Sequence, residues 1–220
     1  MKVLKMNSIE IKISKNLVDY ESSVNFMQKK VQGIQTNTSN ELLWFLEHNH
    51  IYTQGTSANK NEIIKTNNIN IIKTNRGGKT TYHGPGQRII YFLIDLNKRK
   101  KDIRRFITVI ESSVITLLAD YNIEARSFKD RVGIWVIKSN KIKFNKERKI
   151  GAIGLRVSKW VTYHGLSLNI DTNLKYYDFI NSCGLKGYKN TSLSELKVNI
   201  TKEEFDYKFE KIFNKKISQF

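Results

Sequence analysis

The chain has 220 residues, 40% of them hydrophobic, which is enough for one buried core and predicts a single domain over residues 1–220. Lys and Arg outnumber Asp and Glu by 38 to 20, and the formal net charge of +18 favours an acidic partner such as nucleic acid, an anionic membrane or an acidic protein. One cysteine excludes a disulfide framework and a thiolate-rich zinc site. The balance of 29 Lys to 9 Arg, amid abundant Asn and Ile, is also typical of drift in an A+T-rich genome.

The predicted elements are helices near both ends of the chain and strands between them. Apolar residues at helical spacing predict a helix over residues 17–34, and apolar or β-branched runs predict strands over 41–46, 69–72 and 88–94. An amphipathic helix is expected over 103–121, followed by strands over 132–137, 150–157 and 161–170, with a hairpin loop over 139–148. The last predicted helix covers 201–218 and begins with a capping box, Thr201 and Glu204. This order predicts an α+β sandwich.

No apolar run has the length of a signal peptide or of a membrane span, so we expect a reducing, cytoplasmic location.

Residues 76–87 hold the densest group of chemically informative residues, with four glycines, the only proline and a histidine. Such a segment lets the backbone approach a ligand and offers amide N–H donors. The fragment Gly78-Lys79-Thr80 is not a phosphate-binding P-loop, because Lys73 stands where that motif needs glycine and a strand follows instead of a helix. The alternative is a wide hairpin turn, which needs one or two glycines but no Arg, Tyr or His.

Three further segments hold candidate site residues, each with a structural alternative. Lys149 ends a basic cluster, where it could be one more solvated side chain, and the small residues of 151–154 follow it directly. A strand of small residues leaves room for a ligand to lie flat. His164 could be a core histidine, and Cys183 could be a buried, inert thiol or a nucleophile.

Together these segments resemble the lipoyl(octanoyl) transferase family over about residues 17–197. The resemblance rests on several motifs in the family's order: Glu47-His48, Tyr52-Thr53-Gln54-Gly55, Arg76-Gly77-Gly78, Tyr82-His83-Gly84-Pro85-Gly86-Gln87, Lys149-Ile150-Gly151-Ala152-Ile153-Gly154, His164-Gly165-Leu166 and Cys183-Gly184. It implies the biotin/lipoyl protein ligase fold, a two-layer sandwich with a mixed, largely antiparallel sheet flanked by helices. The chain departs from the family where Ser182 replaces a proline before the cysteine, and where Asn49 and His50 replace another proline.

The resemblance also implies residue roles. Cys183 matches the nucleophile that accepts the acyl group, and Lys149 matches the lysine that lowers the pKa of the thiol and acts as general acid and base. His164 is expected to support the substrate pocket, whose implied residues are Arg76, Gly77, Gly78, Lys79, Thr80, Thr81, Tyr82, His83, Ala152, Ile153, Gly154, Gly165, Leu166 and Ser167. Oxyanion donors are expected either in the Gly77-Gly78 turn or around Gly154.

The implied reaction moves an octanoyl group from octanoyl-acyl carrier protein to a lysine of lipoyl domains in oxo-acid dehydrogenase complexes and related carriers. It needs no cofactor, no metal and no ATP, and the expected partners include neither nucleic acid nor membrane. Two alternatives stay open, an ATP-dependent lipoate–protein ligase of the same superfamily and a basic nucleic-acid-binding protein. On the transferase hypothesis, the basic residues 141–148 would speed docking of acidic carrier proteins.

Overall fold

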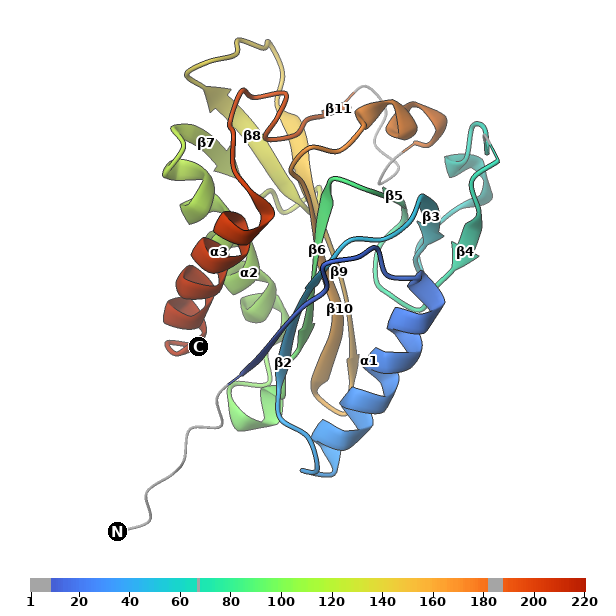
Figure 1. Cartoon of the computed structure of the whole chain (residues 1–220), viewed down its shortest axis with the longest axis vertical. Coiled ribbons are helices and arrows are strands. Elements are labelled where there is room, and N and C mark those ends of the chain that lie inside the picture. Colours follow the sequence, from blue (N-terminus) through green and yellow to red (C-terminus); the bar gives the residue numbers. More distant parts are fainter. Residues whose placement is uncertain (1–8, 67, 182–187) are drawn as a thin grey trace.

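The structure is a computed structural model of the chain, and it describes residues 9–66, 68–181 and 188–220 (Figure 1). The helices in this part of the chain are α1 (Tyr20–Gln35), α2 (Ile103–Ala119) and α3 (Lys202–Ile217). The strands are β1 (Glu10–Ile13), β2 (Leu42–Leu46), β3 (Ile51–Gln54), β4 (Ile71–Lys73), β5 (Thr80–His83), β6 (Gln87–Leu93), β7 (Ile123–Arg126), β8 (Ile134–Ser139), β9 (Arg148–Ser158), β10 (Val161–Asn169) and β11 (Lys189–Asn190).

The strands form two sheets. The large sheet has the order β1-β2-β6-β10-β9-β8-β7, and β11 pairs with β9 outside this path. Its neighbours are antiparallel except β1 with β2 and β11 with β9. The small sheet has the order β4-β3-β5. The prediction of an α+β fold with a mixed, largely antiparallel sheet flanked by helices is confirmed, as is the hairpin that joins β8 to β9.

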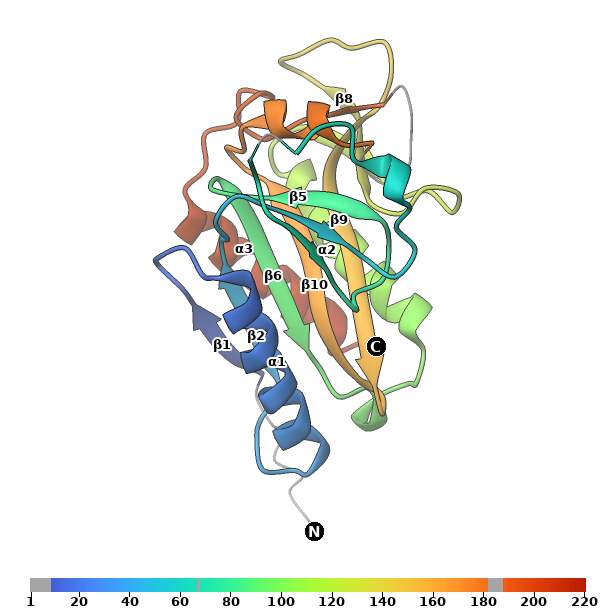
Figure 2. The ribbon, with the colours of Figure 1, turned by 90° about the vertical axis from the view of Figure 1, so that its right-hand side faces the viewer.

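Both faces of the large sheet are covered. Helices α2 and α3 pack on one face, whereas α1 and the small sheet lie over the other, so layers flank the sheet on each side (Figures 1 and 2). The strands alternate accordingly, since Phe45 and Phe92 join the core beneath α2 and α3, whereas Trp44 and Tyr91 join the core beneath α1. Each strand of the sheet centre is therefore apolar on both sides, which explains its continuous apolar sequence.

The three helices begin at side-chain caps. Asp19 accepts a hydrogen bond from the Ser22 amide at 2.8 Å, so α1 starts after the predicted residue 17. Thr201 accepts one from the Glu204 amide at 3.1 Å, as the predicted capping box requires. The apolar stripe that follows places Phe205, Phe209 and Phe213 in the core.

Several short strands escaped the sequence analysis. Strands β1, β3, β5, β7 and β11 have two to four residues each, too few for a clear periodic pattern. The most important is β5, which lies inside the glycine-rich segment and divides it into two turns. One of these turns, Gly84 to Gln87, has Pro85 second and Gly86 third at φ +80°, and the Gln87 amide donates to the Gly84 carbonyl at 3.1 Å. This is the pattern of a type II turn.

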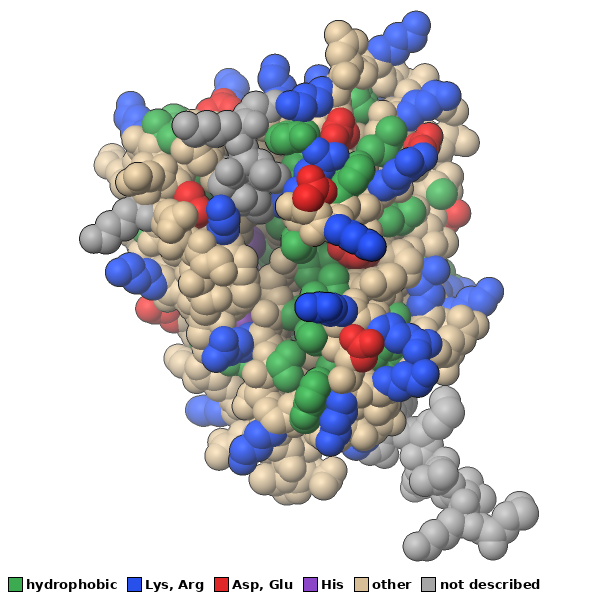
Figure 3. Space-filling view, turned by 180° about the vertical axis from the view of Figure 1, so that it is seen from behind, with side chains coloured by type: hydrophobic (Ala, Val, Ile, Leu, Met, Phe, Trp, Pro, Cys, Tyr) green, Lys and Arg blue, Asp and Glu red, His purple; other side chains and the backbone are tan. Residues whose placement is uncertain are grey.

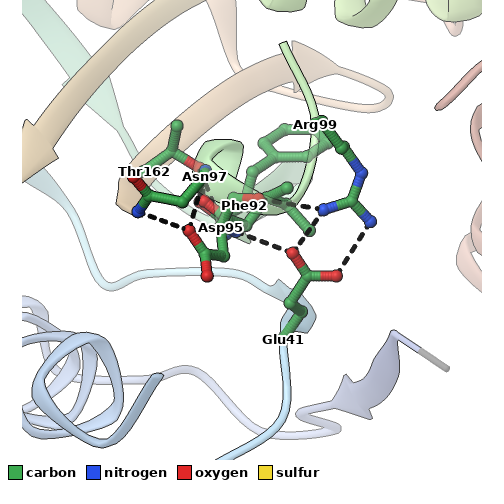
Figure 4. Close-up of polar contacts among 7 residues, drawn as sticks. Glu41, Phe92, Asp95, Asn97, Arg99 and Thr162 are labelled. Carbon is green, nitrogen blue, oxygen red and sulfur yellow. Dashed lines mark hydrogen bonds and ion pairs between the residues drawn. The ribbon is translucent and has the colours of Figure 1, made fainter. Parts of the chain in front are cut away.

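A compact polar network closes the end of the large sheet where β2 and β10 begin (Figure 4). The buried carboxylate of Glu41 accepts two hydrogen bonds from the Arg99 guanidinium, at 2.5 and 2.8 Å, and a third from the Asp95 amide at 2.7 Å. Asp95 in turn accepts from the Asn97 amide, and Asn97 donates to the Lys159 carbonyl. The network joins the start of β2 to the loop after β6 and to the β9–β10 turn.

Candidate active site

A cavity of about 340 Å³ lies between the central strands of the large sheet and the turn before β5. Figure 3 shows histidine side chains within a hollow of the surface, with Lys and Arg side chains around it. The volume lies in the lower part of the range of small-molecule sites, roughly 300–1,000 Å³. The cavity is lined by Tyr20, Ser57, Arg76, Gly78, Lys79, Thr81, His83, Ile89, Tyr91, Asp130, Arg131, Val132, Lys149, Ala152, Ile153, Gly154, His164, Gly165, Leu166 and Ser167.

The structure thus brings most of the predicted pocket residues together, with Lys149 among them. Gly77, Thr80 and Tyr82 are predicted pocket residues that do not line the cavity. Side chains alternate along β5, so Thr81 and His83 face the cavity while Tyr82 packs into a cluster with Tyr52. The Thr80 amide donates to the buried carboxylate of Glu62 at 2.9 Å, which secures the small sheet.

Arg76 holds the turn that forms one wall of the cavity. Its buried guanidinium donates to the Thr53 carbonyl at 2.7 Å, to the Lys79 carbonyl at 2.8 Å and to the Gly77 carbonyl at 2.9 Å. The Gly77 amide donates to the Leu155 carbonyl of β9 at 3.1 Å. That amide is therefore engaged within the fold, and of the oxyanion donors considered for the turn the Gly78 amide is the better candidate.

Three buried histidines surround the inner part of the cavity, two of them in its lining. His83 donates from Nδ1 to Gln87, and His164 donates from Nε2 to the Asn75 side-chain oxygen at 3.0 Å. His48 donates from Nδ1 to the Val18 carbonyl, and its Nε2 is 2.7 Å from the Tyr91 hydroxyl. Each ring is therefore oriented by a neighbouring polar group.

Burial keeps these histidines neutral at pH 7, because removal from water disfavours the imidazolium form. It lowers the pKa of His48 to about 4. It lowers the pKa of His164 to about 3, and the charge of Arg76 acts in the same direction. Burial also lowers the pKa of His83 well below its ordinary value. The inner cavity is consequently polar without carrying histidine charge.

The Glu-His pair identified in the sequence supports the cavity from behind. Glu47 accepts a hydrogen bond from the Gly86 amide at 3.0 Å and pairs with Lys202 of α3 at 2.5 Å. Gly86 is itself packed tightly, since a Cβ there would lie 2.3 Å from the Asp171 carbonyl oxygen. Glu47 therefore fixes the turn that leads into β6, and His48 fixes Tyr91 in the cavity wall.

Lys149 is a buried side chain near the start of β9. Its ammonium donates to the Val132 carbonyl at 2.9 Å, and its own carbonyl accepts from the Thr191 amide at 2.8 Å. The reading of Lys149 as one more solvated charge does not fit this burial, since an ammonium is rarely buried without hydrogen-bond partners. Lys149 thus presents a cation at the cavity wall.

Cys183 and Ser182 lie outside the described residues. The structure describes the chain up to Asn181 and again from Tyr188. Before the gap, the Asn181 amide donates to the Glu62 carbonyl at 2.7 Å. After the gap, β11 runs parallel to β9, with Asn190 opposite Lys149. The chain that carries the cysteine therefore resumes beside the predicted catalytic lysine.

Sequence analysis missed several residues of the wall, among them Tyr20, Tyr91 and Arg131. Tyr91 sits in a strand whose pattern indicates only core, and Arg131 belongs to a charged run before β8. The prediction of an apolar strand beginning at Val132 was displaced by two residues, because β8 begins at Ile134. Neither the strand boundary nor the charged run 129–131 carries a signal that would single these residues out in one sequence.

No group of three or more His, Cys, Asp or Glu side chains among the described residues is arranged to hold a metal ion. No helix in this part of the chain combines the length and apolar character that crossing a membrane requires.

Comparison with known proteins shows the family. Residues 19–214 match the model of the lipoyl protein ligase A/B catalytic domain. A protein of Bartonella bacilliformis named octanoyltransferase is 43% identical over 209 residues, covering 93% of this chain and 87% of its own length. An octanoyltransferase of Ehrlichia chaffeensis is 41% identical, covering 96% of this chain and 97% of its own.

Solved structures show the same fold. A bi-partite lipoate protein ligase of Thermoplasma acidophilum, whose structure was studied together with its E2 lipoyl domain, superposes with a TM-score of 0.69. The match covers 96% of this chain and 85% of the other, at 13% sequence identity. At this identity the similarity concerns the fold, which agrees with the fold that the sequence motifs imply.

Proposed function

This chain belongs to the family of the lipoyl protein ligase A/B catalytic domain and is an octanoyltransferase, and we propose that it carries the octanoyl group as a thioester on Cys183. The proposed donor is octanoyl-acyl carrier protein, and the proposed acceptor is a lysine of a lipoyl domain in oxo-acid dehydrogenase complexes and related carriers. Relatives at about 40% identity favour this activity over an ATP-dependent ligase and over a nucleic-acid-binding protein.

The first step needs a thiolate. A thiol of pKa ~8.5 is only about 3% ionised at pH 7, and a neighbouring ammonium lowers that pKa. The Cys183 thiolate attacks the carbonyl carbon of the donor thioester, and the bond from that carbon to the pantetheine sulfur breaks. The departing sulfur takes a proton from the Lys149 ammonium, which leaves Lys149 as a neutral amine and the octanoyl group on Cys183.

In the second step Cys183 is the leaving group, and Lys149 accepts a proton instead of donating one. The amine of the acceptor lysine attacks the thioester carbonyl carbon, an amide bond forms, and the Cys183 thiolate leaves. The proton lost by the attacking nitrogen passes to Lys149, which restores the ammonium. Exchange of one thioester for another is nearly balanced in energy and conversion to an amide is downhill, so the cycle needs no ATP.

One observation carries this proposal: the Lys149 ammonium stands in the cavity wall, beside the strand at which the chain resumes after Cys183. The apolar side chains Ala152, Ile153 and Leu166 line the same cavity and suit an alkyl chain. Burial of such a chain contributes about 0.8 kcal/mol per CH₂. The Gly78 amide is a proposed donor to the oxyanion, together with amides near Gly154.

Basic residues next to the cavity suit acidic carrier proteins. The end of the β8–β9 loop and β11 form a surface groove of about 350 Å³ whose charged side chains are Lys143, Lys146, Arg148, Lys189 and one acid, Glu147. The loop residues of this groove end at Arg148, one residue before Lys149, so charge there steers a carrier protein toward the site. We place the reaction in the cytoplasm, where a reducing environment keeps the single cysteine as a thiol.

A transfer assay tests the activity. The protein, octanoyl-acyl carrier protein and a lipoyl domain are combined without ATP, and octanoylated lipoyl domain is measured by mass spectrometry. The proposal predicts transfer without ATP, and predicts no transfer when free octanoate replaces the carrier-bound form, even with ATP present. Transfer from free octanoate that depends on ATP would instead identify a ligase.

A further inference from the structure

The segment between β7 and β8 lines the cavity beside Lys149 but has no role in the reaction described above. Its Val132 carbonyl accepts the hydrogen bond from the Lys149 ammonium at 2.9 Å. A lysine side chain has four rotatable bonds, so its ammonium stays at one place only if a partner holds it there. The Val132 carbonyl is therefore one of the groups that fix the position of the Lys149 ammonium.

Gly133 lets the lysine reach that carbonyl. Its φ is +133°, in a region that L side chains rarely adopt. A Cβ on Gly133 would lie 2.5 Å from Lys149 Cε and 2.6 Å from the Gly151 carbonyl oxygen. The lysine side chain thus passes directly over a backbone position that has no side chain of its own.

Arg131 fixes the same backbone from the other direction. Its guanidinium donates to the carboxylate of Glu147 and to the hydroxyl of Tyr188. It also lies over the rings of Phe128, at 3.9 Å from the centroid, and of Trp135, at 5.1 Å. We call these five side chains the Arg131 cluster.

The Arg131 cluster is closed by two further contacts. The Trp135 indole N–H donates to the Arg131 carbonyl at 3.2 Å, and the rings of Trp135 and Tyr188 meet edge to face at 5.1 Å. The Lys149 ammonium lies 5.5 Å from the Trp135 ring. Both the backbone and the side chain of residue 131 are therefore held, immediately before the carbonyl that accepts from Lys149.

We propose that Arg131 is a positioning residue, which holds the Val132 carbonyl so that Lys149 keeps its ammonium in the cavity wall. In this role Arg131 acts on the reaction through Lys149. A planar guanidinium can bond two acceptors and stack on rings at once, which a lysine cannot do. The consequence for turnover rests on the proposed role of Lys149, whereas the consequence for the position of Lys149 does not.

The first test measures the position of Lys149 without reference to activity. Wild-type protein and the Arg131→Ala variant are treated with a trace of acetic anhydride, and the acetylation rate of each lysine is followed by mass spectrometry of peptides. In the wild type, Lys149 is buried and should react more slowly than surface lysines. Arg131→Ala should raise the rate at Lys149 severalfold and leave Lys138, on the exposed side of β8, unchanged.

The matched control is Arg126→Ala, which removes an exposed arginine of β7 that pairs with Glu124 of the same strand. It should leave the Lys149 rate at the wild-type value. Equal Lys149 rates in the wild type, Arg131→Ala and Arg126→Ala would overturn the proposal. Should Arg131→Ala fail to fold, Glu147→Gln, which weakens one arm of the Arg131 cluster, replaces it with the same expected direction.

The second test is a double-mutant cycle on turnover. Arg131→Ala should lower kcat by up to about 100-fold, with a much smaller change in KM, because a displaced catalytic group costs rate more than binding. In the Lys149→Ala background the same change should have little further effect. An equal loss in both backgrounds would overturn the proposal by showing that Arg131 acts independently of Lys149.

The two tests separate the possible failures. If Lys149→Ala leaves turnover unchanged, the proposed function of Lys149 is wrong, and the acetylation rates still decide whether Arg131 positions that side chain. If Lys149→Ala abolishes turnover but the acetylation rates do not respond to Arg131→Ala, the function stands and the positioning role is wrong.

Discussion

Buried polar groups gather at both ends of the large sheet, but they are arranged differently. At the end where β2 begins, the Glu41 carboxylate is enclosed by Arg99 and the Asp95 amide, so polar atoms satisfy one another (Figure 4). At the other end, Lys149, His83 and His164 border a cavity of about 340 Å³. The first arrangement joins segments of the fold, and the second presents polar groups to a ligand. Substitutions at the two ends should consequently affect different properties.

Lys149→Ala should have the largest effect on activity. Loss of a general acid and base typically costs about 10²- to 10⁴-fold in rate, so kcat should fall within that range. The free energy of unfolding should change far less than the activation free energy, since a typical hydrogen bond such as the one to the Val132 carbonyl contributes only about 1 kcal/mol. Steady-state transfer kinetics and urea unfolding measure the two quantities.

Lys138→Ala, which removes an exposed lysine from the adjacent strand, is the control and should retain wild-type turnover. If Lys149→Ala turned over as fast as this control, the proposal that polar groups at the cavity serve activity would be contradicted.

Arg99→Ala should have the largest effect on stability. It leaves the carboxylate of Glu41, which is 1% exposed, without its cationic partner. Removal of one partner from a buried pair typically costs about 3–5 kcal/mol of unfolding free energy, and the 18% exposure of Arg99 places the expected loss at the lower limit. Turnover should stay at the wild-type level at temperatures where the variant is folded.

Lys30→Ala breaks a more exposed pair with Glu10 and should cost at most about 1 kcal/mol. A comparable loss of unfolding free energy in Arg99→Ala and Lys30→Ala would show that the buried Glu41 network contributes no more to stability than an exposed ion pair.

Acid should weaken the cavity end through its histidines. Because burial lowers the pKa of His48 and His164 to about 4 and 3, the unfolded chain binds more protons than the folded protein below an unfolded pKa of about 6.5. The free energy of unfolding should therefore decrease as pH falls from 6.5 toward 4, by up to about 1.4 kcal/mol per pH unit for each histidine.

Urea unfolding at several pH values measures this slope, and His164→Asn should reduce it by the share of one histidine. Between pH 8 and 9 the histidines are neutral in both states, so the variant and the wild type should show parallel curves there. If the unfolding free energy of His164→Asn fell with the same slope as that of the wild type below pH 6.5, the burial of His164 as a neutral ring would be contradicted.

Charge reversal beside the cavity should have the smallest effect at physiological salt. Lys143→Glu with Lys189→Glu changes the basic groove, and kcat/KM for the carrier protein should fall by roughly tenfold at low ionic strength. Screening shortens the range of these charges to about 8 Å at 0.15 M salt, so most of the loss should disappear there.

Lys98→Glu with Lys100→Glu makes the same change in net charge at the opposite end of the sheet and should have little effect. Equal losses from both pairs would assign the net charge of +18 to composition instead of to docking.

The apolar parts of the fold could be predicted because their periodicity is local. The stripe of Phe205, Phe209 and Phe213 indicates the buried face of α3, and the run in β6 indicates a strand buried on both sides. The pocket could be predicted only as motifs of a family. Nothing local indicates that Tyr82 faces away from the cavity, since the four residues of β5 are too few to show their alternation.

Arg131 shows the other limit of prediction from one sequence. In the charged run 129–131 it reads as a solvated residue, but its partners Glu147 and Tyr188 are 16 and 57 residues away. Tyr20, at the start of α1, reaches the cavity only because the helix packs against the sheet. Such contacts depend on tertiary structure, and no residue pattern in one sequence encodes them.

Intact-protein mass spectrometry after mixing with octanoyl-acyl carrier protein tests the central claim most directly, that Cys183 and Lys149 form one acyl-transfer unit. In the absence of lipoyl domain, the wild type should gain the mass of one octanoyl group, and hydroxylamine should remove it as expected of a thioester. Cys183→Ala should gain nothing, and Lys149→Ala should acquire the adduct far more slowly than Lys138→Ala. A hydroxylamine-sensitive adduct of normal rate on Cys183→Ala, or on Lys149→Ala, would contradict the account.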